Sequence, residues 1–186
     1  MNLAGQAPPK MESARHIQWA VASGSPSGRA FLLRSITRRS TALNCATWSF
    51  CFSDGDGLFL EEKRDMGYQV ERMSPSQGYR ISRRDSEGRF SFVKEVIADP
   101  MRPCVLLRTK IEGNSDFLQK LKAYVLCAPH LEVGGEANNA HVIEASGRQL
   151  LVAEKQNRWI VVGASCDFSR LSCGYVGHSD GYTDLV

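Results

Sequence analysis

Apolar and β-favouring residues occur in short runs from about residue 58 onward, and polar turns separate each run from the next. In the clearest run, Leu121, Ala123 and Val125 alternate with Lys122 and Tyr124, which is the period of a strand with one buried face. Short strands at this spacing are typical of an antiparallel sandwich or barrel. The runs that we expect to form strands are Leu58–Glu62, Tyr68–Met73, Tyr79–Arg84, Arg89–Ala98, Cys104–Ile111, Lys120–Ala128, His141–Ala145, Gln149–Glu154 and Trp159–Ala164. We therefore predict an all-β fold, an antiparallel β-sandwich.

Turn residues between these runs support the same interpretation. The tetrapeptide Asp85-Ser86-Glu87-Gly88 separates two of them, and this predicts a hairpin in which Gly88 takes a positive φ. Residues 112–116, of sequence Glu-Gly-Asn-Ser-Asp, predict a further turn. We find no helical stripe before Ser165, and expect only one or two helical turns, over Cys166–Cys173.

The composition is that of an ordinary globular domain. The chain has 186 residues, 42% of them hydrophobic and 23% charged, which is enough for one domain with a core. No stretch of ~18 apolar residues is present, so we expect no membrane partner. We expect no secretory signal because no apolar run follows the first basic residue, and this slightly favours a cytoplasmic location.

Charge is unevenly distributed between the two ends. Residues 1–51 hold six basic residues and one acid, which leaves 17 basic and 19 acidic residues for the remainder of the chain. An excess of this kind is typical of nucleic-acid arms and transit peptides. However, no aromatic residues interleave with the arginines of the segment 34–41, so we expect no nucleic-acid partner.

The six cysteines show no metal-binding spacing. None form a C-x-x-C pair, and no Cys/His group has the spacing of a zinc site. The alternatives are a disulfide framework and a set of small buried side chains in a reducing compartment, and we favour the second. The positions are Cys45, Cys51, Cys104, Cys127, Cys166 and Cys173.

A series of short motifs resembles the N-terminal domain of prokaryotic glucoamylases and glucodextranases in glycoside hydrolase family 15. Their order and spacing carry the resemblance, which covers about residues 52–186. The chain has Tyr182-Thr183 where the family usually has Trp-Gln. The motifs are the runs at residues 53–59 (SDGDGLF), 61–65 (EEKRD), 78–80 (GYR), 93–95 (VKE), 124–126 (YVL), 128–131 (APHL), 172–177 (SCGYVG) and 179–181 (SDG).

The resemblance implies a fold and a context. The family domain is a super-β-sandwich that precedes an (α/α)6 barrel, and two glutamates of that barrel hydrolyse terminal α-glucosidic bonds with inversion. We therefore expect an incomplete sandwich over residues 52–186, which is non-catalytic because it stops before the barrel. The expected partner is that catalytic barrel, with α-glucan as a candidate ligand. The alternative is a stand-alone carbohydrate-binding or interaction module.

Residues 1–51 do not resemble the family, and we expect an irregular basic segment there. When residues 29–51 are read through one shifted codon frame, they can encode the run that the family carries at this position. An out-of-frame translation would explain the basic excess without any partner. A disordered arm, a transit segment and an RNA-binding segment are the alternatives.

Few residues of the chain suggest catalytic or metal-binding chemistry. Asp54 and Asp56 could begin a Ca²⁺ loop, but the EF-hand pattern also needs a Glu at loop position 12, where the chain has Asp65. Glu95 faces solvent or pairs with Lys94, and no second carboxylate opposite it is evident. His130 and His178 fit structural and loop positions. The residues 61–65 read as a solvated charge run. We therefore expect no catalytic residue, no metal and no cofactor.

Three aromatic residues are candidates for carbohydrate contact, since pyranose rings stack well on aromatic faces. They are Trp159, Tyr175 and Tyr182. The alternative for Trp159 is a place in the core. For the two tyrosines the alternatives are packing against another domain and an ordinary surface position.

Overall fold

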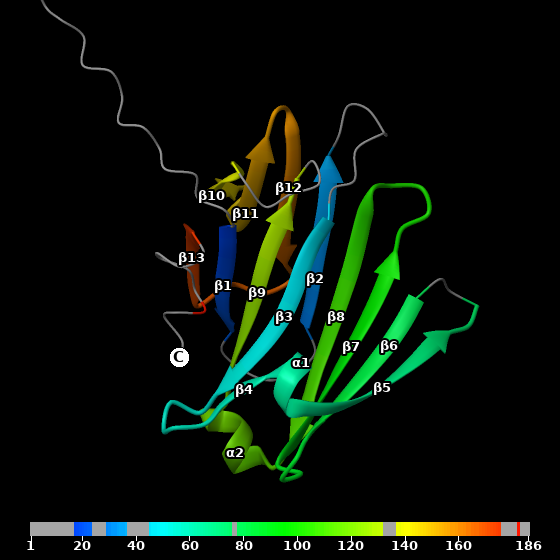
Figure 1. The fold of residues 1–186 in the computed structure, drawn as a ribbon, viewed down its shortest axis with the longest axis vertical. Helices are drawn as coiled ribbons and strands as arrows, with labels where there is room; N and C mark the ends of the chain where they lie inside the picture. Colours follow the sequence, from blue (N-terminus) through cyan, green and yellow to red (C-terminus); the bar gives the residue numbers. More distant parts are fainter. Residues whose placement is uncertain are drawn as a thin grey trace, which may run out of the picture.

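A computed structural model describes residues 17–23, 29–36, 45–75, 78–131, 137–175 and 182, and for residues 17–23, 29–36, 45 and 46 it describes the backbone only. These residues are folded mainly as strands that form two antiparallel sheets (Figure 1). This confirms the all-β sandwich that the alternating runs predict.

The smaller sheet has five strands. In spatial order they are β13 (Arg170–Tyr175), β1 (Ile17–Ser23), β9 (Lys122–His130), β3 (Cys45–Ser53) and β4 (Phe59–Glu61). The larger sheet has eight strands, in the order β10 (Asn139–Ala145), β11 (Arg148–Lys155), β12 (Arg158–Ala164), β2 (Arg29–Ile36), β8 (Cys104–Gly113), β7 (Phe90–Ala98), β6 (Gly78–Asp85) and β5 (Met66–Met73).

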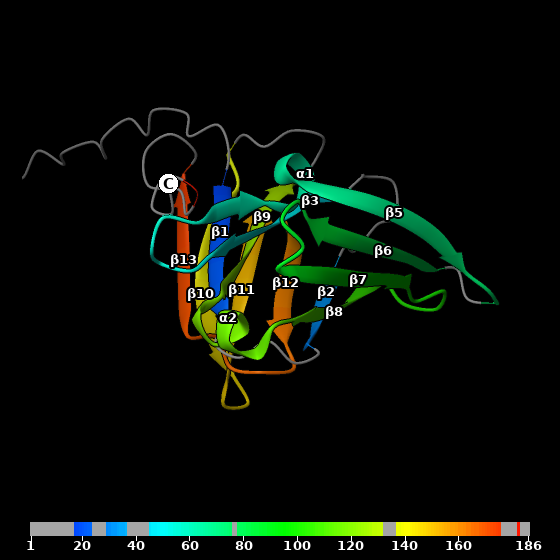
Figure 2. The same ribbon diagram turned by 90° about the horizontal axis from the view of Figure 1, so that it is seen from below.

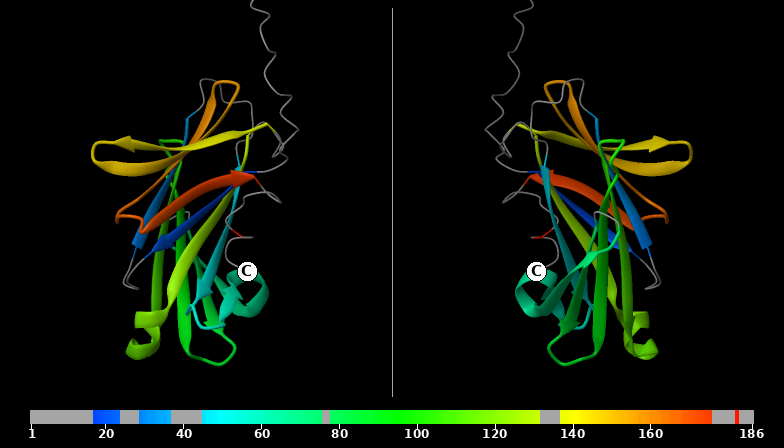
Figure 3. Two further views of the ribbon diagram at one scale, coloured as in Figure 1. Left: turned by 90° about the vertical axis from the view of Figure 1, so that its left-hand side faces the viewer. Right: turned by 90° about the vertical axis from the view of Figure 1, so that its right-hand side faces the viewer.

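The two sides of the sandwich differ. On one side the edge strands β10 and β13 contact each other and bring the two sheets together (Figure 3). On the other side the sheets are joined by the short helix α1 (Glu62–Asp65), which leads from β4 in one sheet to β5 in the other. In Figure 2 the strands β5 and β6 extend outward, beyond the five-stranded sheet.

Aromatic side chains from both sheets meet in the core. Phe50 and Phe52 of β3 face Phe90 and Phe92 of β7, and all four are at most 2% exposed. Their ring centroids lie 4.7 Å apart for Phe50 and Phe92, and 5.1 Å apart for Phe52 and Phe90. Such pairs each contribute about 0.5–1.5 kcal/mol beyond the burial of their area. These contacts link β3 of the small sheet to β7 of the large one.

The expectation of an irregular segment over residues 1–51 is wrong for three strands. β1 lies between β13 and β9, β2 lies between β12 and β8, and β3 pairs with β9 along its whole length. The sequence of β2, Arg-Ala-Phe-Leu-Leu-Arg-Ser-Ile, is rich in residues that favour strands, and its arginines obscured this in an argument based on charge. The rest of residues 1–44 lies outside the described residues.

Two local expectations about helices are also wrong. Residues 166–173 were expected to form helical turns, but β13 occupies Arg170–Tyr175 and pairs with β1. The turn expected at residues 112–116 instead leads into the helix α2 (Ser115–Lys120). Asn114 starts this helix, because its side-chain oxygen accepts hydrogen bonds from the backbone of Asp116 and Phe117.

The hairpin expected around Asp85-Ser86-Glu87-Gly88 is confirmed. Gly88 has a φ of 71°, and its N–H donates to the carbonyl oxygen of Asp85 over 2.9 Å. A residue with a Cβ seldom adopts this conformation. The turn fixes the pairing register of β6 and β7, on which the site described below depends.

Cys51, Cys104, Cys127, Cys166 and Cys173 are free thiols, of which Cys51 and Cys127 are buried and the other three are partly exposed; Cys45 is described only by its backbone. Neither α1 nor α2 has the length or the apolar character that a membrane crossing requires.

Candidate functional site

Charged residues lie on both faces of the sheet formed by β5, β6, β7 and β8. Successive side chains of a strand point to opposite faces, so Phe92 and Lys94 of β7 point into the sandwich, whereas Val93 and Glu95 point away from it. We call these the inner and the outer face. The two faces carry different arrangements of charge, and each is a candidate for function.

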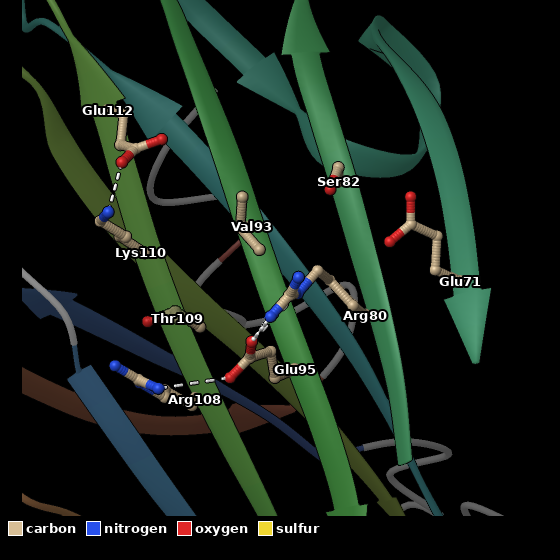
Figure 4. A pocket seen from close by; sticks show the side chains of 9 residues that line it. All are labelled: Glu71, Arg80, Ser82, Val93, Glu95, Arg108, Thr109, Lys110 and Glu112. Carbon is tan, nitrogen blue, oxygen red and sulfur yellow. Dashed lines mark hydrogen bonds and ion pairs between the residues drawn. The ribbon is translucent and has the colours of Figure 1, made fainter. Parts of the chain in front are cut away.

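On the outer face, the strand register aligns residues of alternating charge across four strands. Glu71 of β5 is opposite Arg80 of β6, Arg80 is opposite Glu95 of β7, and Glu95 is opposite Arg108 of β8. We call these four residues the outer row (Figure 4). Opposite charges at directly facing positions stabilise a sheet, each pair by about 0.2–1 kcal/mol.

Glu95 is the centre of the outer row. One of its carboxylate oxygens accepts hydrogen bonds from Nη2 and Nε of Arg80, at 2.8 and 3.1 Å. The other oxygen lies 3.5 Å from Nη1 of Arg108. Both oxygens therefore already face guanidinium groups. Glu95 does not pair with Lys94, and this answers the question that the sequence left open.

The outer row forms part of a shallow hollow of about 470 Å³. An ion pair between Lys110 and Glu112 lies in the same hollow. The residues that line it are Glu71, Arg80, Ser82, Val93, Glu95, Arg108, Thr109, Lys110 and Glu112. They include no aromatic ring, histidine or thiol. The hollow can donate and accept hydrogen bonds and match opposite charges, but it offers no aromatic ring on which a sugar could stack.

On the inner face, a carboxylate and two cations are buried together. Nζ of Lys94 lies 2.6 and 2.8 Å from the two carboxylate oxygens of Glu62 in α1. Nε of Arg83 lies 3.8 Å from the same carboxylate, and Lys94 also lies over the ring of Phe50. We call Glu62, Arg83 and Lys94 the buried cluster. Burial lowers the pKa of Lys94, and the carboxylate of Glu62 opposes this shift.

The buried cluster corrects the expectation that residues 61–65 form a solvated charge run. Glu62 is 0% exposed, because α1 turns it inward between the sheets. A charged residue is almost never fully buried unless it is paired, so the missing information was its partner, Lys94, 32 positions along the chain. No pattern in the sequence around Glu62 indicates that partner.

The three aromatic candidates lie on different elements of the fold. Trp159 is in β12, and its Nε1 donates to Glu154 of β11 over 3.1 Å. Tyr175 ends β13, at one edge of the five-stranded sheet. Tyr182 contacts the ring of Phe59 in β4, at the opposite edge, with ring centroids 6.0 Å apart. Four strand spacings, roughly 19 Å, separate those edges, so the three do not form one platform. Whether any of them contacts sugar alone stays a prediction.

The other candidate residues have structural positions. Oδ1 of Asp54 accepts hydrogen bonds from the backbone of Asp56 and Leu58, and these bonds lower its pKa. Within the described ranges, no group of three or more His, Cys, Asp or Glu residues could hold a metal ion. His130 lies at the end of β9, and His178 lies outside the described residues.

Sequence reasoning did not find the outer row, nor Tyr68 and Tyr79, two strongly exposed tyrosines of β5 and β6. The alternation of each strand is visible in the sequence, and the hairpin at Gly88 indicates that β6 and β7 pair. The register was the missing information, because a slip of one residue would place Arg80 opposite Lys94 instead of Glu95.

Comparison with known proteins gives consistent results. Residues 39–186 match the family described as glucodextranase, domain N. A glucoamylase of Clostridium sp. (strain G0005) is 28% identical over 137 residues, which is 73% of this chain and 20% of the relative. A crystal structure of a bacterial glucoamylase complexed with acarbose matches with a TM-score of 0.55 and 18% identity, over 74% of this chain and 28% of that chain. This chain therefore spans about a fifth of the curated relative, and the structural likeness supports the fold.

Proposed function

Because this chain belongs to the glucodextranase domain N family, we propose that it acts as the non-catalytic N-terminal domain of a glucoamylase-like α-glucan hydrolase. The observation that carries the proposal is the family match over residues 39–186, which includes most strands of both sheets. The parent activity is then the inverting hydrolysis of terminal α-glucosidic bonds, performed by a catalytic (α/α)6 barrel of the same enzyme. That barrel is the proposed partner, and α-glucan is the substrate that the barrel would bind.

The charged hollow supports a non-catalytic role. Inverting hydrolysis needs a protonated acid and a carboxylate base on opposite sides of the bond, ~6.5–9.5 Å apart. In the hollow, Glu95 is held between two guanidinium groups and Glu112 is paired with Lys110. Of the three carboxylates in the hollow this leaves only Glu71, and one carboxylate cannot serve as both the acid and the base.

The alternative of a stand-alone carbohydrate-binding module is less favoured. Such a module needs aromatic rings that act together on one ligand, and the three candidates lie on separate elements. Trp159, Tyr175 and Tyr182 are retained only as proposed single contacts.

An assay and the gene sequence together test the proposal. The purified chain, incubated with maltotetraose and with soluble starch, should release no glucose above a protein-free blank. Glucose release that persists through repeated purification would contradict the non-catalytic role. In the genome, a reading frame for an (α/α)6 barrel should follow the region that encodes this chain, and an unrelated gene there would contradict the proposed partner. The same nucleotides test the shifted frame proposed for residues 29–51.

A further inference from the structure

The strand β5 ends the eight-stranded sheet and has one side without a neighbouring strand among the described residues. It pairs with β6 along its whole length, and residues 67–72 are all exposed. Figure 2 shows β5 as the outermost strand of the region that extends beyond the five-stranded sheet. Its free side therefore presents a row of backbone N–H and C=O groups to which another strand can add.

The other edge strands of the described sheets are short or closed. β4 has only three residues, and β10 and β13 contact each other across the two sheets. Proteins commonly protect edge strands by such shortening or covering, or by proline and lysine. β5 has eight residues, Met-Gly-Tyr-Gln-Val-Glu-Arg-Met, with neither proline nor lysine. Among the described edges, β5 is therefore the one most open to pairing.

The two charged side chains of β5 indicate what a pairing strand must carry. Glu71 points to the outer face opposite Arg80, but Arg80 donates its hydrogen bonds to Glu95. Arg72 is the next residue, so it points to the inner face. Neither Glu71 nor Arg72 makes an ion pair or a side-chain hydrogen bond with a described residue. A matching strand would bring a donor to Glu71 and an aromatic ring to Arg72.

A second copy of β5 meets both requirements. When two copies pair in antiparallel orientation with Val70 opposite the partner's Val70, their inner faces lie on the same side of one sheet. On the inner face, Arg72 of each copy is then opposite Tyr68 of the other. On the outer face, Glu71 of each copy is opposite Gln69 of the other. Each of these contacts occurs twice, once on either side of the two-fold axis.

Contacts of the same kind already exist within the hairpin. The guanidinium of Arg83 lies over the ring of Tyr68, 5.0 Å from its centroid, and the pairing would bring Arg72 of the other copy to the free side of that ring. At the axis, Ile81 lies opposite Val70 within each copy, so the two valines would stand in an apolar row. On the outer face the amide of Gln69 would donate to the partner's Glu71, which extends the outer row into the second copy.

Other registers that keep the inner faces together are less favourable. A pairing centred on Glu71 or on Arg72 places that residue opposite the same residue of the partner, and like charges directly opposite each other destabilise a sheet. A pairing centred on Gln69 places Glu71 opposite Gly67, which has no side chain to donate. The register centred on Val70 is thus the one that the charges favour.

We propose that β5 is a homodimer interface, in which two copies of this chain pair through residues 67–73 about a two-fold axis between the two Val70 residues. The pairing joins the two large sheets into one continuous sheet. The interface uses the same surface on both copies, so assembly stops at two. This inference goes beyond the proposed function and does not depend on it, because the role of a domain in a hydrolase does not fix its number of copies.

Sedimentation equilibrium and amide hydrogen exchange test the interface directly. The purified chain should fit a monomer–dimer equilibrium over a wide range of protein concentration. Exchange at residues 67–73 should slow as concentration rises through the dissociation constant of the dimer. The strand β10 (Asn139–Ala145), also an edge strand, is the internal control and should exchange at the same rate throughout.

Two substitutions of opposite charge test the register. Gln69→Lys places a cation opposite the partner's Glu71, and should lower the dissociation constant of the dimer by about threefold or more. Gln69→Glu places like charges opposite each other and should raise it by about threefold or more. Ser82→Lys and Ser82→Glu carry the same charges on β6, one strand away from the interface, and should each change it by less than about twofold.

Several outcomes would overturn the proposal. A monomer at every concentration excludes the dimer, and a series of larger oligomers would indicate that β5 pairs with β4 of a next copy instead. A monomer in which β5 exchanges slowly at every concentration would show that another segment of the same chain covers this edge. Shifts of the same sign for Gln69→Lys and Gln69→Glu overturn the register. Glucose release by the chain bears only on the proposed function.

Discussion

Lys94 and Glu95 are neighbours on β7, but they belong to two regions that differ in their exposure to water. Lys94 points inward and is 7% exposed, in the buried cluster with Glu62 and Arg83. Glu95 points outward into the outer row, where its partners Arg80 and Arg108 are 47% and 67% exposed in their side chains. In each region one carboxylate, Glu62 or Glu95, lies between two basic residues. They differ in how much water the charges have lost.

This difference decides what each region can contribute. Exposed ion pairs contribute about 0–1 kcal/mol, because water and salt screen the attraction. Buried pairs have lost their hydration, so removal of one partner leaves a charge with nothing to replace water. Removal of one partner from the buried cluster should therefore destabilise the fold strongly, whereas removal of one partner from the outer row should have a small effect.

Breaking the buried pair should have the largest effect. Glu62→Ala leaves Lys94 buried without its carboxylate, and we expect a loss of about 3–5 kcal/mol in the free energy of unfolding. Urea unfolding followed by tryptophan fluorescence measures it. The double substitution Glu62→Leu with Lys94→Met removes both charges and should recover much of the loss. A single substitution that costs less than about 1 kcal/mol would show that water reaches the cluster.

The core on the same strand gives the next comparison. Phe92→Ala removes a ring that contacts Phe50 and Phe52, and should cost about 3–5 kcal/mol. Val93→Ala, the next residue but on the outer face, should cost less than about 1 kcal/mol. Equal losses in urea unfolding would contradict the assignment of inner and outer faces on β7.

The sequence predicts only part of the contrast between the outer row and the buried cluster. Alternation in residues 89–98 predicts the strand and the two faces of β7, because the period of a strand is local information. The hairpin before it is also predicted, since Gly88 meets a local requirement for positive φ. The pairing of Glu62 with Lys94 is not predicted, because it needs α1 to cross between sheets and close a loop of 32 residues.

For the N-terminal strands the local sequence did indicate the structure, but an argument from charge overrode it. Residues 29–36 have the composition of a strand, yet the basic excess of residues 1–51 led to the expectation of an irregular segment. β2 lies between β8 and β12, so each of its residues pairs with residues at least seventy positions away in the sequence. The net charge of a segment does not predict which distant strands it pairs with.

Acid should remove more stability from the buried end of the β6–β7 hairpin than from an exposed ion pair. Hydrogen bonds from Arg89 hold the pKa of Asp85 below its ordinary value of 3.8. The resulting stabilisation is fully present above the pKa of the unfolded chain and is lost as pH falls through the folded pKa. Asp85→Asn should cost about 1.5–3 kcal/mol near neutral pH, and should flatten the decline in urea midpoint below about pH 4. Glu87→Gln is the control, because Glu87 pairs with the same arginine but is 70% exposed in its side chain. Equal losses for the two variants would contradict this prediction.

The substitution with the smallest expected effect gives the clearest test of the difference between the outer row and the buried cluster. Glu95→Gln removes the charge shared by Arg80 and Arg108 but keeps the shape of the side chain, and should cost about 0.2–1 kcal/mol. Because the arginines are largely exposed, this cost should fall towards zero in 1 M NaCl, where the screening length is about 3 Å. Glu62→Gln is the matched variant, and its larger cost should stay nearly constant with salt, since ions do not enter the space between the sheets. If salt changed the cost of Glu95→Gln and the cost of Glu62→Gln by the same amount, both carboxylates would contact solvent to a similar extent. That result would contradict the division of β7 into a buried face and a solvent-exposed face.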